Sequence, residues 1–126
     1  MAFLIIMNLA GMYLNLWGNI PDFSSAAKAF GSIPLLDAHV AFAIAIAGNV
    51  ALFTIRAIRP PGRQFRPIAT MAIGFAALAI FSGVEFTFNG GNDVFSMTME
   101  IGFIGLVAVN AYVLFAVGRM RRAAGP

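Results

Sequence analysis

The chain has 126 residues, of which 60% are hydrophobic and 10% are charged, and its mean hydropathy is +0.87. Its length suits a single domain, but a soluble domain carries about 25% charged residues, so the composition excludes a water-soluble fold and indicates an integral membrane protein. The net charge of +3 lies at the ends of apolar segments and not on a polar surface, so no nucleic-acid partner is expected. The absence of cysteine excludes disulfides, thiolate metal sites and covalently attached haem.

Four apolar segments are long enough to cross the hydrocarbon core of a bilayer, which takes about 20 helical residues. They cover about residues 1–20, 35–58, 68–88 and 94–118. The sequence therefore predicts an all-α fold, in which one integral membrane domain, residues 1–126, forms a four-transmembrane-helix bundle. The first segment has no basic start and no clear cleavage site, so we interpret it as a retained span and not as a signal peptide.

The three connections between these segments differ in character. Phenylalanine and alanine recur at helical spacing within residues 23–30, which predicts a short interfacial helix in the first outer loop. Residues 59–67 hold three prolines and three arginines, so helix cannot continue there and the segment must lie in water or among headgroups. Residues 89–93, NGGND, predict a tight reversal in which Asp93 caps the last helix.

Seven of the eight basic residues fall on one side of the predicted bundle. They are Arg56, Arg59, Arg63, Arg66, Arg119, Arg121 and Arg122. Positive residues in short loops stay cytoplasmic, so we expect both termini and the middle connection on the cytoplasmic side of a prokaryotic cytoplasmic membrane. Lys28 and all five acidic residues then belong to the outer half.

An acidic and a basic residue are 19 positions apart in each of the last three segments, which corresponds to about 28 Å along a helix. The acids are Asp37, Glu85 and Glu100, and His39 lies two residues beyond the first of them. Because this distance is close to the hydrocarbon thickness, the acids are expected at one depth near the outer boundary. These four residues are the candidate site for a ligand or a proton.

Two of these candidates, Asp37 and Glu100, also have ordinary structural explanations. Asp37 lies in the first turn of a helix, where a carboxylate is stabilised by the helix dipole. Glu100 lies near the interface and could pair with Lys28. Glu85 lies near a helix C-terminus, where the dipole disfavours negative charge, and no cation is near it in sequence, so it is the leading functional candidate.

A metal or haem site would have to be built around the single histidine. Asp37 and His39 point about 200° apart on a helix, so a metal ion of unknown type would need His39 with Glu85 or Glu100 from a neighbouring helix. His39 could also be a single axial ligand to haem or chlorophyll. No nucleophile turn accompanies the histidine, so no catalytic residue is assigned and the protein is not expected to be an enzyme.

Lipid gives apolar helices no hydrophobic reason to associate, so small side chains and interhelical hydrogen bonds are expected to hold the bundle together. The candidates for helix packing are Asn8, Asn15, Asn49, Asn110, Gly83 and Gly102. Asn49 and Asn110 precede their arginines by seven and nine positions in helices of the same direction, so they are expected to meet in the inner half of the bundle.

Three stretches carry a resemblance to a known class of protein. They are GMYLNLWGNIP in the first segment, the helix opening around His39, and FNGGNDVFSM between the last two segments. Together they resemble uncharacterised small four-helix membrane proteins of prokaryotes. The resemblance implies a fold, and it brings no activity, substrate or catalytic residue with it.

The favoured hypothesis is a non-catalytic accessory or scaffold subunit of a larger membrane complex, such as a respiratory, photosynthetic or monooxygenase assembly. It depends on the small extramembrane mass, the incomplete catalytic set and the many small and aromatic residues, including 13 Phe. The expected partners are the lipid bilayer and other membrane subunits. The sequence requires no cofactor, and it leaves haem, chlorophyll, quinone and a metal ion open as alternatives.

Two alternatives remain open at this point. The first is a small oligomeric transporter or ion-binding protein in which Glu85 and Glu100 take up protons or cations from the outer side. The second is a carrier that holds haem or chlorophyll through His39 alone.

Overall fold

The structure is a computed structural model of the whole chain, and it describes residues 33–60, 62–89 and 92–123 together with Ile6, Leu9, Gly11, Tyr13 and Gly31. The elements in these ranges are α3 (Pro34–Ile58), the 3-10 helix η1 (Gly62–Phe65), α4 (Arg66–Phe88) and α5 (Asp93–Ala123). Among the described residues there is no strand, so this part of the chain is all-helical. The predicted span at residues 1–20, apart from four helical residues within it, and the predicted interfacial helix lie outside the described residues.

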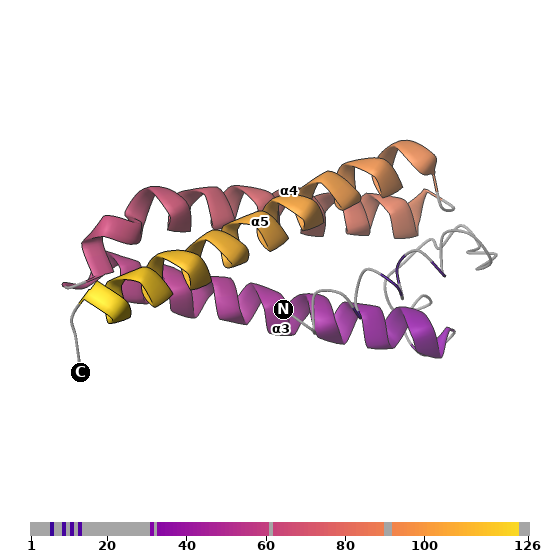
Figure 1. Cartoon of the computed structure of the whole chain (residues 1–126). Coiled ribbons are helices and arrows are strands. Elements are labelled where there is room, and N and C mark those ends of the chain that lie inside the picture. The colour runs from indigo at the N-terminus through magenta and orange to yellow at the C-terminus, as the bar shows by residue number, and fades with distance from the viewer. Residues whose placement is uncertain are drawn as a thin grey trace.

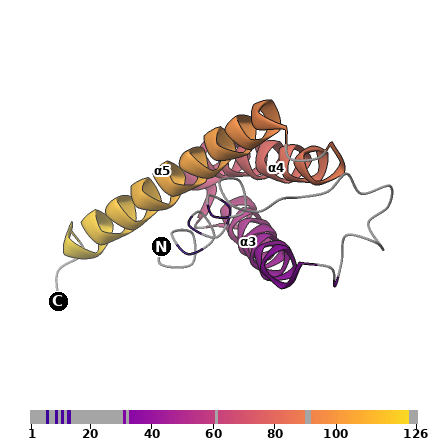
Figure 2. The ribbon, with the colours of Figure 1, turned by 90° about the vertical axis from the view of Figure 1, so that its right-hand side faces the viewer.

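The three long helices follow one another up and down. Figure 1 shows α3 and α5 running in the same direction and α4 running in the opposite direction. In Figures 1 and 2, α3 lies below the pair that α4 and α5 form. Each of the three helices is long and apolar enough to cross a membrane.

Large apolar side chains cover the outside of these helices. Ile44 of α3, Phe81 of α4 and Phe115 of α5 each expose more than 60% of their surface. Such a surface is unsuited to water and suited to lipid, since the bilayer core is as apolar as these side chains. The described helices therefore indicate a protein that contacts the lipid bilayer.

Proline positions explain where the helices begin and end. Pro34 and Pro67 lie in the first turns of α3 and α4, where the missing N–H costs nothing because it would have no helical partner. Arg59, which precedes Pro60, has extended backbone angles of φ −84° and ψ 145°, and α3 ends just before it. A residue before proline is driven out of the helical region, so Pro60 sets this boundary.

The start and length of α5 differ from the sequence-based expectation. The backbone N–H of Val94 donates to Oδ1 of Asn92 (2.9 Å), and that of Phe95 donates to the Asn92 carbonyl (3.1 Å). The cap is therefore Asn92, and the prediction of Asp93 was wrong by one residue. At the other end α5 continues to Ala123, five residues past the predicted span, because nothing in its basic last turn stops a helix.

The buried centre of the bundle joins all three helices. Leu106 of α5 exposes 2% of its surface and packs with Ala72 and Ala76 of α4. Ile46 and Val50 of α3 close the same cluster from the other side. Small side chains on α4 thus let the larger residues of α3 and α5 reach one shared core.

Candidate functional site

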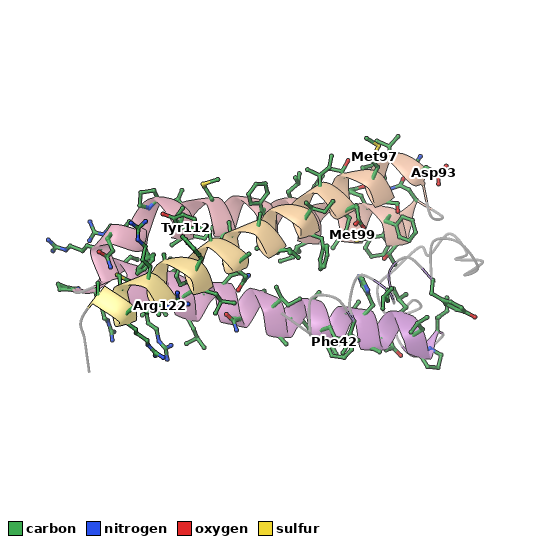
Figure 3. The ribbon with its side chains drawn as sticks, in the orientation of Figure 1. Phe42, Asp93, Met97, Met99, Tyr112 and Arg122 are labelled. Carbon is green, nitrogen blue, oxygen red and sulfur yellow. The ribbon has the colours of Figure 1, made fainter. Side chains whose placement is uncertain are left out.

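The candidate residues gather toward one end of the bundle because of the helix directions. Asp37 lies in the first turn of α3, Glu85 in the last turn of α4 and Glu100 eight residues into α5, and these parts of the helices all lie toward the right-hand end of the bundle in Figure 1. Figure 3 shows Asp93 at this end and Arg122 at the opposite end. We call these the acidic end and the arginine end.

Asp37 is held by the backbone of the segment that precedes its helix. Its two carboxylate oxygens accept hydrogen bonds from the backbone N–H of Gly31, at 3.1 and 3.0 Å. Gly31 has a φ of +78°, which favours glycine, and this conformation aims its N–H at the carboxylate. The contact ties the chain entry to the start of α3, where a negative charge also meets the positive end of the helix dipole.

Glu85 has a neutral partner that the sequence-based interpretation did not identify. The side-chain amide of Asn89 donates to Oε2 of Glu85 (2.9 Å) and to the Glu85 backbone carbonyl (2.8 Å). The backbone N–H of Asn89 also reaches that carbonyl, at 2.9 Å. Asn89 therefore closes the C-terminus of α4 and binds the carboxylate at the same time. The i, i+4 spacing of the two residues is the signal that points to this pair.

Glu100 and His39 lie in different surroundings. Glu100 is exposed on α5, whereas His39 is half-buried on α3. The imidazole packs against Gly11, where an added Cβ would stand 3.0 Å from Cε1 of His39. Within the described residues, no group of three or more His, Cys, Asp or Glu side chains is arranged to hold a metal ion.

A cavity of about 290 Å³ lies between α3, α4 and α5. Its described wall is built mainly from aliphatic and aromatic side chains, and His39 is the one titratable residue in that wall. The hydroxyl of Thr87, which also lines the cavity, donates to the carbonyl of Gly83 at 2.9 Å. Neither Glu85 nor Glu100 belongs to the described lining, so this part of the wall suits apolar groups and presents no carboxylate to a cation.

The two glycines proposed for packing, Gly83 and Gly102, lie between α4 and α5, and so does Gly105. A Cβ on Gly102 would stand 2.8 Å from the carbonyl oxygen of Phe75 and 2.8 Å from the backbone nitrogen of Ala79. A Cβ on Gly105 would overlap the ring of Phe75, and one on Gly83 would stand 3.4 Å from Sδ of Met99. The absence of a side chain at Gly102 and Gly105 is thus what allows α5 to approach α4 this closely.

The asparagines and one serine have separate environments. Asn110 is half-buried and its amide donates to the Leu106 carbonyl of its own helix (2.9 Å), whereas Asn49 is exposed on α3. No hydrogen bond between Asn49 and Asn110 occurs in the described structure. Ser82, which exposes 1% of its surface, has a hydroxyl oxygen without a hydrogen-bond partner among the described residues. Asn8 and Asn15 lie outside the described residues.

Comparison with known proteins assigns neither a family nor a function to this chain. No protein-family model, no curated protein and no solved structure matches the chain. The function is therefore inferred from the chain's own residues and their arrangement.

Proposed function

We propose that this protein is a non-catalytic accessory or scaffold subunit that packs against a larger protein in the membrane. The observation that carries the proposal is one face of α3, which we call the α3 outer face. It consists of the exposed residues Ala41, Ala45, Gly48 and Asn49. Small residues at helical spacing are what a transmembrane helix presents to another helix, because they allow the backbones to approach closely.

The α3 outer face points away from the described bundle. On a regular helix Ala41, Ala45 and Gly48 lie about 180–240° around the axis from His39, which lines the cavity between the three helices. Among the described residues, nothing lies within 4 Å of the position that a Cβ on Gly48 would take. Only Leu36 and Ala57 of this 25-residue helix are buried. α3 therefore has room for a neighbour on the side opposite α4 and α5.

The polar side chain of Asn49 would be stabilised if another protein covered this face. It precedes Arg56 by seven positions, which is about 10 Å along the helix, so its amide falls within the hydrocarbon region. Lipid tails offer no hydrogen-bond partner to an amide, and a side-chain hydrogen bond to a neighbouring helix contributes about 0.6–2 kcal/mol. A partner helix with a polar group at this depth would satisfy Asn49 while packing on Gly48.

Photocrosslinking tests this interface directly. A photocrosslinking amino acid in place of Ala45 is expected to form a covalent adduct with a membrane protein of fixed mass in native membranes. The same group in place of Ile104, which is 57% exposed on α5, is the matched control and is expected to react with lipid. Adducts of Ala45 with lipid alone would contradict the proposal. Adducts only with further copies of this chain would instead favour the oligomeric transporter.

We also propose a four-helix topology for the whole chain. Residues 1–20 supply the first span, an interfacial helix follows it in the outer loop, and both termini lie in the cytoplasm of a prokaryotic cell. The apolar character of residues 1–20 and the arginines at one end of the described helices support this arrangement.

Single cysteines can test the orientation without background, because the chain has none of its own. In intact cells a membrane-impermeant maleimide is expected to label Asp93→Cys, at the acidic end, and to leave Arg63→Cys unlabelled until the membrane is permeabilised. Both positions are exposed, so labelling depends on the side of the membrane and not on burial. The reverse pattern would show that the arginine end faces outward.

A further inference from the structure

We propose that the arginine end binds the anionic headgroups of membrane phospholipids. Seven arginines define it, and all seven are exposed. They are Arg56 in the last turn of α3, Arg59, Arg63 and Arg66 around η1, and Arg119, Arg121 and Arg122 at the end of α5.

One contact joins the two sets of arginines, which are far apart in the sequence. The amide Nε2 of Gln64 in η1 donates to Sδ of Met120 in α5, at 3.1 Å. Arg63 is adjacent to Gln64 in the chain, and Arg119 and Arg121 flank Met120. The connection between α3 and α4 therefore lies against the last turns of α5, and nitrogen-tipped side chains gather there in Figure 3, where Arg122 is labelled.

No acidic residue of the described part of the chain lies at the arginine end to neutralise these charges. The described acids are Asp37, Glu85, Asp93 and Glu100, and all four lie at the acidic end or within two turns of it. Arg66 donates through Nη2 to the carbonyl of Ile58 (3.0 Å), which fixes one guanidinium but leaves its charge uncompensated. Seven neighbouring positive charges repel one another, so an external anion would stabilise this end.

The position of the cluster favours lipid over a soluble polyanion. The connection between α3 and α4 is short and η1 makes up most of it, so it cannot extend far from the membrane surface. Ile58 and Met120 expose 55% and 40% of their surfaces beside the arginines. A surface that combines guanidinium groups with apolar side chains matches the boundary between phosphate headgroups and acyl chains. Guanidinium also binds phosphate oxygens in a bidentate manner.

Lipid retention measures this binding. The protein is reconstituted in vesicles of equal parts phosphatidylglycerol and phosphatidylcholine with identical chains, extracted in mild detergent, and the retained lipids are quantified by mass spectrometry. We expect the retained lipid to be enriched in phosphatidylglycerol over the 1:1 starting mixture. The variant Arg59→Gln, Arg63→Gln, Arg122→Gln is expected to lose this enrichment, at roughly fivefold in relative affinity for each arginine removed.

A charge-preserving variant and two competing ligands serve as controls. The variant Arg59→Lys, Arg63→Lys, Arg122→Lys keeps the charge and is expected to retain most of the enrichment, and circular dichroism checks that each variant is helical. A wild-type protein that retains both lipids equally would overturn the proposal, whatever the variants do. Release of the anionic lipid by millimolar inorganic phosphate, or tighter binding of an RNA oligonucleotide than of phosphatidylglycerol vesicles, would equally overturn it by identifying a different ligand.

Discussion

Replacing Gly102 by alanine is expected to lower the free energy of unfolding by about 1–3 kcal/mol, the usual cost of overpacking a close contact. The new methyl group would stand 2.8 Å from the Phe75 carbonyl oxygen and from the Ala79 backbone nitrogen. These are backbone atoms of α4, so no side-chain rotation can relieve the overlap and the two helices must separate. In a bilayer no other attraction makes up for this separation, because close packing is what holds apolar helices together.

Gly74→Ala is the matched control for this prediction. Gly74 also lies within a helix that is long and apolar enough to cross a membrane, but no described residue lies within 4 Å of the position its Cβ would take. Alanine has the higher helix propensity, so this change is expected to be neutral or to stabilise by up to about 1 kcal/mol. Thermal unfolding of both variants in one mild detergent, followed by circular dichroism, compares them. Equal destabilisation by the two substitutions would contradict the close α4–α5 approach.

The helix boundaries were largely predictable because proline and charge determine them locally. Pro34 and Pro60 bracket α3, and α4 begins at Arg66, directly before Pro67. The C-terminus of α5 was not predictable from hydropathy, because Arg119 to Arg122 end the apolar segment but not the helix. The length of an apolar segment reflects the thickness of the hydrocarbon core, whereas a helix can continue into the headgroup region beyond it.

The rotation of each helix about its axis was harder to predict. A helix that is apolar all round gives no periodic signal for its buried face, and α4 buries Ala69, Ala72 and Ala76 while it exposes Ile73 and Phe81. Gly102, one of the small residues proposed for packing, lies at a close contact with the backbone of α4.

Within the described helices, Asn49 and Asn110 do not form the interhelical hydrogen bond that their shared depth in the bundle suggests. The shared depth of these two residues does not fix which way either amide points. In the structure the Asn110 amide bonds to Leu106 of its own helix and Asn49 is exposed.

In the candidate site, some features follow from the local sequence and others depend on the tertiary structure. The position of Asp37 in a first helical turn follows from its spacing to Pro34, but its hydrogen bond to Gly31 depends on a left-handed backbone conformation that composition does not reveal. The sequence points to Glu85 because no cation is near it. Its hydrogen-bond partner is Asn89, which carries no charge, so the distribution of charges along the sequence does not reveal it.

Replacing Leu106 by alanine is expected to lower the free energy of unfolding by about 2 kcal/mol, near the lower limit of the roughly 2–5 kcal/mol that this change costs in soluble cores. Leu106 exposes 2% of its surface and joins the cluster shared by all three described helices. Part of the cost in water comes from transferring the side chain out of solvent, and this part is small in lipid, which is as apolar as leucine. What remains is the loss of packing contacts around an enlarged cavity.

Leu114→Ala isolates that packing term, because Leu114 lies on the same helix and exposes 63% of its surface. Lipid replaces the lost methyl groups there, so the free energy of unfolding is expected to change by less than about 0.5 kcal/mol. Reversible unfolding in lipid bicelles measures both variants under one condition. If Leu114→Ala were as destabilising as Leu106→Ala, the exposed side of α5 would be a packed surface in the folded protein, and the outward face of the bundle would have to be assigned differently. A large loss confined to Leu106 would instead establish that the described helices pack around this residue.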